Sequence, residues 1–278
     1  MIEVHKPGLH TSIQDRGRVG HQHLGVPISG AMDHESANCA NLLLGNDLDC
    51  ALLEITVLGP VLFFKSATSI AVTGAECKCT LDGETIEQYK VISVRSGQRL
   101  KIGTCTKGTR VYLAVSGGVQ SEEVMGSRSQ MKGITSSEFL TKDDKLPIPE
   151  PSVIETEAAP SMLNLDTSIL QVYSGPEFEQ LSKIQRNSLL SHSFEIQQDS
   201  NRIGTQLRGV EGLYAHEIIT SPVQVGTVQL TPSGTLIVLM RDAPVTGGYA
   251  RILQLTPEAI NALAQKEIRT CVEFELMS

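Results

Sequence analysis

Two polar loops near the C-terminus carry side chains that could bind a small polar molecule. The loops span residues 229–234 and 242–249, and the second begins with Asp242. Their candidate substrate-binding residues are Gln229, Ser233, Thr246, Gly247, Gly248 and Tyr249. Residues 235–240 are apolar and bounded by turn signals, which predicts a buried strand with one loop at each end. Such loops can face one pocket, where glycine lets the backbone approach closely, or they can be ordinary turns of a β protein.

The N-terminal stretch of residues 7–33 is a second group that could do chemistry. Its candidate site residues are Gln14, Asp15, Arg16, Arg18, His21 and Asp33. Polar residues and glycines are dense here and follow neither a helical nor an alternating period, so the stretch indicates loops. The two groups share a composition that neither needs for packing. We therefore expect the side chains of this stretch to share one pocket with Gln229 or Asp242.

The elements that would position these loops are mostly short β-strands separated by glycine turns. Apolar and β-branched runs predict strands at residues 2–5, 52–56, 61–65, 69–73, 91–94, 99–102 and 111–115. Helices are predicted at residues 34–44, 176–190 and 257–266. Proline suits the first position of the last two helices, because the N–H that it lacks would be unpaired there. The chain is therefore expected to be mainly β with a few helices.

Composition divides the chain into three parts. Residues 1–145 and 168–278 are β-rich, and residues 146–167 form a Pro/Glu-rich stretch that is typical of a linker. The two halves share Arg, an aliphatic residue, Gly, Gln and Gly at equal spacing, starting at Arg18 and at Arg202. Chance could produce this match, but the order of the shared residues agrees with a duplicated β unit.

The charge balance excludes some classes of partner. The 278 residues include 31 Asp and Glu against 23 Lys and Arg, which gives a net charge of -8. This acidic balance argues against nucleic acid and anionic membranes as partners. Apolar runs also fall short of the roughly 20 residues that a membrane helix needs. We expect a cytoplasmic protein.

Six cysteines are sparse in a chain of this length, and without a secretion signal they favour free thiols. Cys77 and Cys79 form the one close pair, and in a strand their side chains would share a face. A metal site there would need a second Cys or His pair nearby in the sequence. Because none lies nearby, we predict no metal site. The other four cysteines are expected to be packed core residues.

The ordered series of motifs closely resembles one protein family. The stretches that carry the resemblance are residues 7–21, 25–33, 41–47, 53–55, 73–75, 112–119, 126–129, 229–234 and 242–249. The family is the KipA type. It includes the C subunit of bacterial 5-oxoprolinase, allophanate hydrolase subunit 2 and the corresponding part of the urea carboxylase carboxyltransferase domain.

The resemblance implies two fused cyclophilin-like β-barrel units and a role in an enzyme complex. Such proteins pair with a KipI-like partner, the B subunit of 5-oxoprolinase, expected here as a heterotetramer, and they act with a separate hydrolase component, the A subunit. The implied reaction is ATP-dependent opening of 5-oxo-L-proline to L-glutamate, for which this chain alone would be inactive. This chain has no nucleotide-binding motif. ATP would therefore be bound by another part of the complex. Residues 130–133 also lack the Ala-Met-Lys-Met setting for covalent biotin.

The implied substrate gives the candidate side chains possible roles. Opening a stabilised lactam calls for donors where negative charge develops on the carbonyl oxygen. The candidates for this role are Arg16, Arg18, Arg128 and Arg202. The candidates that could position a nucleophile or move a proton are Asp15, Asp33, Asp242 and His21. Each has a structural alternative, since a loop Asp often caps a turn and an Arg beside Gly often bridges carbonyls.

The sequence departs from the family pattern in three places, one of which is Thr231 in place of the first Pro of a Gln-Val-Pro-Pro-Ser-Gly run. The glycine-rich basic stretch after residues 126–129 is shortened to residues 130–139, and the last motif loses a Gln and one Thr at residues 243–245. These changes remove side-chain donors and leave two other functions open. One is a carboxyltransferase component of a urea-carboxylase-like enzyme. The other is a binding protein that antagonises a KipI-type inhibitor of a sensor kinase.

Overall fold

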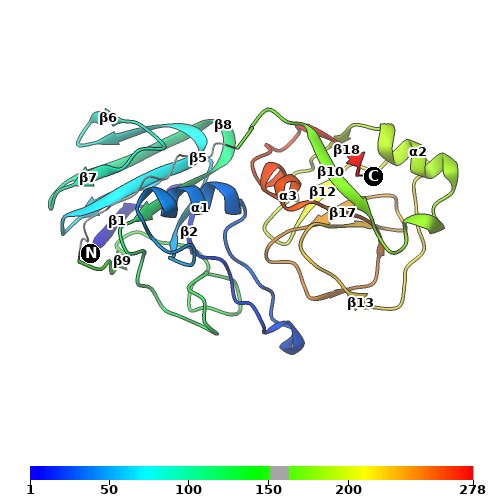
Figure 1. Ribbon diagram of the computed structural model, residues 1–278, viewed down its shortest axis with the longest axis horizontal. Coiled ribbons are helices and arrows are strands. Elements are labelled where there is room, and N and C mark those ends of the chain that lie inside the picture. The colour runs from blue at the N-terminus through cyan, green and yellow to red at the C-terminus, as the bar shows by residue number, and fades with distance from the viewer. Residues whose placement is uncertain (151–162, 278) are drawn as a thin grey trace. The chain divides into compact units, whose positions relative to one another are not determined.

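The computed structural model describes residues 1–150 and 163–277 and is mainly β (Figure 1). These two ranges contain strands β1 to β18 and helices α1 to α3. The prediction of a mainly β chain with a few helices is therefore confirmed. None of the helices in the described ranges is long and apolar enough to cross a membrane.

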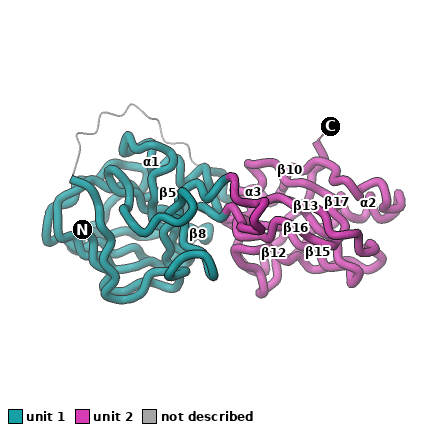
Figure 2. The backbone as a smooth tube through the Cα atoms, turned by 90° about the horizontal axis from the view of Figure 1, so that it is seen from below, with its two compact units in different colours: residues 1–19, 29–165 teal, residues 20–28, 166–278 magenta. Residues whose placement is uncertain are grey.

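The chain forms two compact units (Figure 2). Unit 1 consists of Met1–Val19 and Ser29–Leu165, and unit 2 consists of Gly20–Ile28 and Asp166–Ser278. Of the linker predicted at residues 146–167, residues 151–162 lie outside the described part of the chain.

Unit 1 is a half-barrel made from one nine-stranded antiparallel sheet. Its strands are β1 (Ile2–Lys6), β2 (His10–Gln14), β3 (Leu52–Thr56), β4 (Val61–Phe64), β5 (Thr68–Leu81), β6 (Glu84–Ile86), β7 (Ile92–Val94), β8 (Arg99–Val115) and β9 (Lys145–Leu146). They follow the order β2-β3-β8-β4-β1-β9, and β5 pairs with β6, β7 and β8. The strands predicted at residues 99–102 and 111–115 are the two ends of the single long strand β8.

The sheet of unit 1 has an apolar core on one face of β5 and β8 and a helix on the other. Val72 of β5 lies opposite Leu113 of β8, and both are buried in the larger core. Removing such side chains from water stabilises the fold by about 1.5–3 kcal/mol each. Because side chains alternate along a strand, the neighbours Ala71, Tyr112 and Ala114 face the opposite side, where they pack against helix α1.

Helix α1 (His34–Leu43) covers this second face of β5 and β8 (Figure 1). Asp33 is its N-cap and accepts a hydrogen bond from the Ser36 backbone at 3.0 Å, which satisfies one of the unpaired N–H groups at the helix start. Ala37 and Ala40 are among the side chains that pack on the sheet. Their small size allows the helix backbone to approach the strands closely.

Unit 2 is a nearly closed barrel of seven strands. Its strands are β10 (Ile169–Ser174), β11 (Phe194–Glu195), β12 (Gly204–Leu207), β14 (Thr227–Leu230), β15 (Leu236–Leu239), β17 (Ala250–Leu255) and β18 (Cys271–Leu276). They follow the order β11-β18-β10-β17-β14-β15-β12. A bridge between Ile196 and Leu207 joins the two ends of this order. The short strands β13 (Ser221–Pro222) and β16 (Thr246–Gly247) form a separate ribbon that carries part of the second predicted loop.

The helices of unit 2 agree only in part with the prediction. Helix α3 (Pro257–Ala264) has its proline in the first turn, as predicted. The prediction of a helix that starts at Pro176 is wrong, because this residue lies in a turn and α2 (Lys183–Ser191) begins later. The physical reason is a capping box, in which Ser182 and Gln185 exchange side-chain and backbone hydrogen bonds. This box satisfies N–H groups at the new helix start, and Pro176 offers no equivalent.

Candidate functional site

Asp15 holds two loops of unit 1 together. Its Oδ1 atom accepts hydrogen bonds from the Gly17 backbone at 2.7 Å and from the hydroxyls of Ser127 and Ser129 at 2.7 and 2.6 Å. Its Oδ2 atom accepts a hydrogen bond from the Arg128 backbone at 2.6 Å. A carboxylate offers about four lone-pair positions. These four donors therefore use the acceptor capacity of Asp15 to fix the loops at residues 15–17 and 127–129.

Gln14 and Arg18 brace the same loops from inside the protein. Both are fully buried. The Gln14 Nε2 atom donates to the Gln130 carbonyl at 3.1 Å, and the Arg18 Nη2 atom donates to the Ser129 carbonyl at 2.5 Å. A guanidinium that is removed from water needs such acceptors. The structure therefore brings Gln14, Asp15 and Arg18 together around one loop pair.

Arg16 lies within the first of these loops, whereas His21 belongs to unit 2. The Arg16 side chain is 49% exposed, with its Nε atom 3.9 Å from the Asp49 carboxylate. His21 precedes the 3-10 turn Gln22–Leu24, in the segment Gly20–Ile28 that belongs to unit 2. Of the two arginines in this stretch, Arg16 is thus the one whose charge faces solvent.

Asp33 belongs to a buried polar network at the start of α1. Its Oδ2 atom accepts a hydrogen bond from the Ser36 hydroxyl at 2.6 Å. Its backbone donates to the Tyr112 hydroxyl at 2.8 Å, and this hydroxyl donates to the Glu54 carboxylate at 2.9 Å. Burial, followed by the charge of Glu54, raises the pKa of Tyr112 well above its ordinary value. The network fixes the backbone here, because Met32 also donates to Glu54 at 2.6 Å.

Sequence reasoning named neither Glu54 nor Tyr112 as a site residue. Glu54 is buried on β3 between apolar neighbours. A single carboxylate in an apolar strand must find donors when it is buried, and this signal could have identified it. Tyr112 gives no comparable signal, because tyrosine is common in strands.

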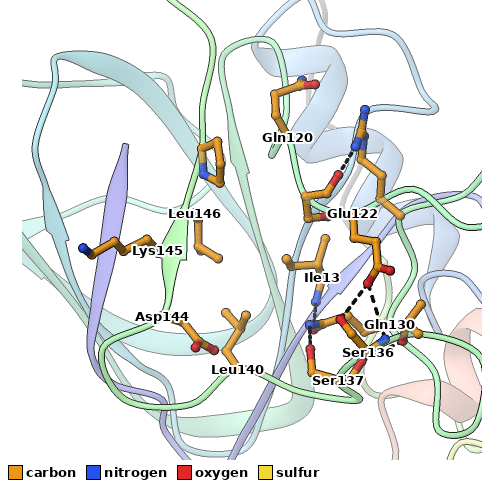
Figure 3. A pocket seen from close by; sticks show the side chains of 14 residues that line it. Ile13, Gln120, Glu122, Gln130, Ser136, Ser137, Leu140, Asp144, Lys145 and Leu146 are labelled. Carbon is orange, nitrogen blue, oxygen red and sulfur yellow. Dashed lines mark hydrogen bonds between the residues drawn. The ribbon is translucent and has the colours of Figure 1, made fainter.

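A pocket of about 280 Å³ in unit 1 is lined by Gln130 (Figure 3). Ile13 and Leu140 contribute to its apolar surface. The Gln130 Oε1 atom accepts a hydrogen bond from the Ile13 backbone at 2.9 Å, and Glu122 accepts one from the Ser136 hydroxyl at 2.6 Å. Residues of the segment 130–139, which was expected to be shortened, therefore form part of the pocket wall. Polar groups around an apolar floor are typical of small-molecule sites.

This pocket lies next to the Asp15 loops without containing Asp15 itself. Arg128 links the two, because its backbone binds Asp15 while its side chain lines the pocket and donates to the Ser121 carbonyl. The Ser121 hydroxyl oxygen is buried at the pocket and makes no hydrogen bond to another described residue. An unpaired buried hydroxyl is costly, so it is a candidate to bind a ligand.

In unit 2, the structure brings the predicted residues Arg202 and Asp242 together as a bidentate ion pair. The Arg202 Nε and Nη2 atoms donate to the two carboxylate oxygens at 2.8 and 3.0 Å. The Asp242 backbone also donates to the Arg202 carbonyl at 2.9 Å. The side chains are 15% and 11% exposed. This geometry fixes the plane of the guanidinium, so Asp242 serves first to orient Arg202.

Gln229 and Gly247 form a second close pair in unit 2. Gln229 is 5% exposed, and its Nε2 atom makes no hydrogen bond to another described residue. A side-chain carbon on Gly247 would lie 2.4 Å from that nitrogen. Glycine is therefore needed here for close approach, as predicted. Neither Gly247 nor Gly248 has a positive φ, so space and not backbone conformation favours glycine at position 247.

The other predicted residues of unit 2 occupy the loops around this pair. Ser233 is exposed, with its hydroxyl 2.9 Å from that of Thr231. Thr246 is exposed on β16, and the Gly248 carbonyl accepts a hydrogen bond from the Ile218 backbone at 2.9 Å. Tyr249 is half-buried just before β17.

Glu177 and Arg251 form an ion pair that was not predicted from the sequence. Arg251 lies at a pocket of about 420 Å³ in unit 2. Arg251 lines the pocket, and its Nε and Nη2 atoms donate to the Glu177 carboxylate at 2.9 and 2.8 Å. These hydrogen bonds lower the pKa of Glu177, against the opposing effect of burial. Arg251 could have been suspected from its place two residues after Tyr249. Glu177 gives no sequence signal, because it binds across 74 positions of the chain.

The sequence of this chain is similar to those of several known proteins. The profile of the carboxyltransferase domain, subdomain A and B, matches residues 24–276. The chain is 31% identical to the C subunit of 5-oxoprolinase from Escherichia coli (strain K12) over 280 residues, which cover 99% of this chain and 90% of that protein. It is 32% identical to the urea amidolyase of Saccharomyces cerevisiae (strain ATCC 204508 / S288c), over 93% of this chain and 16% of that protein.

A solved structure gives the same relationship in three dimensions. The crystal structure of the K. lactis urea amidolyase superposes with a TM-score of 0.90 and 28% identity. The match covers 100% of this chain and 19% of the amidolyase chain. The chain thus spans a small part of the amidolyase and nearly the whole of the separate oxoprolinase component.

Proposed function

The chain belongs to the carboxyltransferase domain family, subdomain A and B, and we propose that it is one component of an ATP-dependent 5-oxoprolinase. The reaction would open 5-oxo-L-proline to L-glutamate. The observation that carries the proposal is the length of the match. The similarity to the C subunit of 5-oxoprolinase covers 99% of this chain and 90% of the relative, as expected for two proteins of the same kind.

We propose further that the chain works in a heteromer. Its relatives are subunits or segments of larger enzymes, and its own sequence has no nucleotide-binding motif. A KipI-like B subunit would form the heterotetramer with it, and the separate A subunit would complete the hydrolase. ATP would be used by the complex in the cytoplasm, and this chain would carry no covalent biotin.

In this proposal Arg202 contacts the substrate. Activation of the lactam carbonyl places negative charge on its oxygen, and a fixed guanidinium stabilises such charge. The bidentate hydrogen bonds from Arg202 to Asp242 support this role, because they fix the guanidinium before substrate arrives. The buried amide of Gln229 would add a second donor. Asp15 and Asp33 would act as positioning residues, since their oxygens hold loop and helix groups.

A urea-carboxylase-like carboxyltransferase is the second candidate function. The observation that favours it is the similarity to urea amidolyase over 93% of this chain. The two functions differ in their substrates. A carboxyltransferase would need a biotin-carrying partner to deliver a carboxyl group, whereas the oxoprolinase needs ATP and 5-oxoproline.

Reconstitution tests the proposal. The chain would be co-expressed with its KipI-like partner, purified by size exclusion and combined with the separate hydrolase component. We expect co-elution, ATP-dependent glutamate formation from 5-oxoproline, and no turnover by the chain alone. Carboxylation of urea in the presence of a biotinylated carrier, with no glutamate formed from 5-oxoproline, would show that the second function is correct. Separate elution of the two chains would contradict the heteromer.

A further inference from the structure

Three cysteines of unit 1 lie together on strands β5 and β8. The sulfurs of Cys77 and Cys79 are 3.5 Å apart, and Cys105 is the cross-strand partner of Cys77. Cys77 and Cys105 are half-buried, and Cys79 is 1% exposed. No group of three or more His, Cys, Asp or Glu side chains in the described ranges is arranged to hold a metal ion. We therefore consider thiol oxidation, and not metal binding, as the chemistry that two sulfurs this close could perform.

Strand irregularity explains why the sulfurs of Cys77 and Cys79 are so close. In a regular strand, residues two apart are separated by about 6.6 Å along the chain. Here the register of β5 shifts between Glu76 and Cys77 and again between Cys77 and Cys79. The Gln88 side chain holds this irregular stretch, because its oxygen accepts from the Cys77 backbone at 3.0 Å and its nitrogen donates to the Ala75 carbonyl at 2.9 Å.

We propose that Cys77 and Cys79 form a site of reversible oxidation, at which a hydroperoxide converts the two thiols into a disulfide. A disulfide requires Cα atoms no more than about 7 Å apart, and a locally irregular strand meets this limit more easily than an extended one. The structure thus holds two thiols in contact, and Cys77 is the more exposed of the two residues.

The reaction balances with hydrogen peroxide as the oxidant. The Cys77 thiolate attacks one peroxide oxygen, the O–O bond breaks, and the leaving hydroxide takes up a proton to become water. The product is a sulfenic acid on Cys77. The Cys79 sulfur then attacks the Cys77 sulfur, the S–O bond breaks, and an S–S bond forms as a second water leaves with the Cys79 proton. Two thiols lose two electrons, and one peroxide becomes two waters.

The hydrogen bond between the sulfurs assists this chemistry. Either sulfur can be the donor, so the pair can share one proton. When Cys79 holds the shared proton, its hydrogen bond stabilises a thiolate on Cys77, which is a better nucleophile than the thiol. Transfer of the shared proton to Cys79 leaves the more exposed Cys77 as the nucleophile.

Trypsin separates the three cysteines and so can identify the bond. Cleavage after lysine places Cys77 in the peptide 66–78, Cys79 in the peptide 79–90 and Cys105 in the peptide 102–107. The full chain would be treated with hydrogen peroxide, blocked with N-ethylmaleimide, digested and analysed by mass spectrometry. We expect the first two peptides to be joined, and to separate after reduction. A link from peptide 66–78 to peptide 102–107, or three unlinked alkylated peptides at saturating peroxide, would overturn the proposal.

Matched variants test the assignment of roles. Cys79→Ser should abolish the internal disulfide and leave Cys77 trapped as a mixed disulfide when glutathione is added. Cys105→Ser should form the same link as the unchanged chain. Cys271→Ser is the control, since this exposed cysteine lies on β18 of unit 2. If Cys105→Ser removed the link while its circular dichroism spectrum stayed native, the pair would be wrongly assigned.

Discussion

Asp15 in unit 1 and Asp242 in unit 2 are both loop carboxylates with an arginine nearby, yet their partners differ. Asp15 accepts hydrogen bonds from backbone and hydroxyl groups of two loops. Asp242 accepts two hydrogen bonds from a single guanidinium. The arginines differ in the same way, because Arg18 is fully buried against a carbonyl, whereas the Arg202 side chain is 15% exposed.

Residue type and loop context therefore do not distinguish a structural carboxylate or arginine from a chemical one, whereas the partner of each group does. A carboxylate satisfied by neutral donors stabilises the loops that supply them. A partly exposed guanidinium that a carboxylate holds in a fixed plane is suited to stabilise a developing anion. The hydrogen bonds therefore support a structural role for the Asp15 loops, and they are the basis for the proposed substrate contact at the Arg202–Asp242 pair.

The largest effect is expected for Asp15→Ala. This change leaves four loop donors without their acceptor, and we expect the free energy of unfolding to fall by about 3–5 kcal/mol. Urea denaturation followed by circular dichroism would measure it. The matched control is Asp49→Ala, because that side chain is 82% exposed and its ion-pair partner lies 3.9 Å away. The control should change stability by less than about 0.5 kcal/mol.

An Asp15→Ala protein that kept its stability but lost activity in the complex would contradict the structural role of Asp15. Asp15 would then act on substrate, and the four hydrogen bonds would be secondary. Asp15 would then have the catalytic role that was predicted from the sequence, and not a structural one.

The next effect is expected on catalysis. Asp242→Asn keeps the shape of the side chain but removes the charge that fixes Arg202, so turnover of 5-oxoproline by the reconstituted complex should fall by about 100-fold. Assembly should persist, and the free energy of unfolding should fall by only about 1–2 kcal/mol, because the pair is partly exposed. Kinetics and size exclusion on the same sample check both. Full activity, or failure to assemble, would show that this Asp is a structural cap.

A smaller effect should follow from Gly247→Ala. The new carbon would lie 2.4 Å from the Gln229 nitrogen, so a buried side chain must move, at an expected cost of about 1–2 kcal/mol of stability. Gly248→Ala is the matched control, because the nearest atom to its new carbon is the Ile218 oxygen at 3.7 Å. Adding Gln229→Ala should restore the stability of Gly247→Ala. No restoration would mean that these two residues do not determine the fit.

Much of the fold could be predicted from sequence because its signals are local. The largely apolar runs of β3 and β4 and the helix that begins at Pro257 depend on neighbours in the chain. The joining of residues 99–102 and 111–115 into β8 was missed, because continuous pairing with β5 carries the strand through the intervening stretch. Pro176 misled the prediction, because the stronger capping box lies further along the chain.

The site was less predictable because its partners are distant in sequence. The residue types of Asp15, Arg202 and Asp242 were recognised, but the hydrogen bond from Ser129 to Asp15 spans 114 positions. Glu54 and Tyr112 depend on pairing between β3 and β8, which no local pattern reveals. The expectation that the loops of both groups share one pocket stays a prediction.

The smallest expected effect is on the pH dependence of stability, and it comes from the ion pair of Glu177 and Arg251 in unit 2. Hydrogen bonds from Arg251 lower the pKa of Glu177. A carboxyl whose folded-state pKa is depressed binds its proton more readily in the unfolded state. Its contribution to stability is therefore fully present above the unfolded pKa and is lost as the pH falls through the folded pKa.

Glu177→Gln should consequently reduce stability at neutral pH and make no difference once the pH is below the folded pKa of Glu177. The measurement is the difference in free energy of unfolding between the two proteins across an acid titration, since other groups titrate in both. Glu179→Gln is the control, because that carboxylate is 78% exposed and pairs with Arg186 instead. The difference in free energy of unfolding could instead stay constant with pH while the Glu177→Gln complex loses ring-opening activity. Glu177 and Arg251 would then take part in catalysis together with Arg202 and Asp242. The pocket beside Arg251 would in that case be the candidate substrate site.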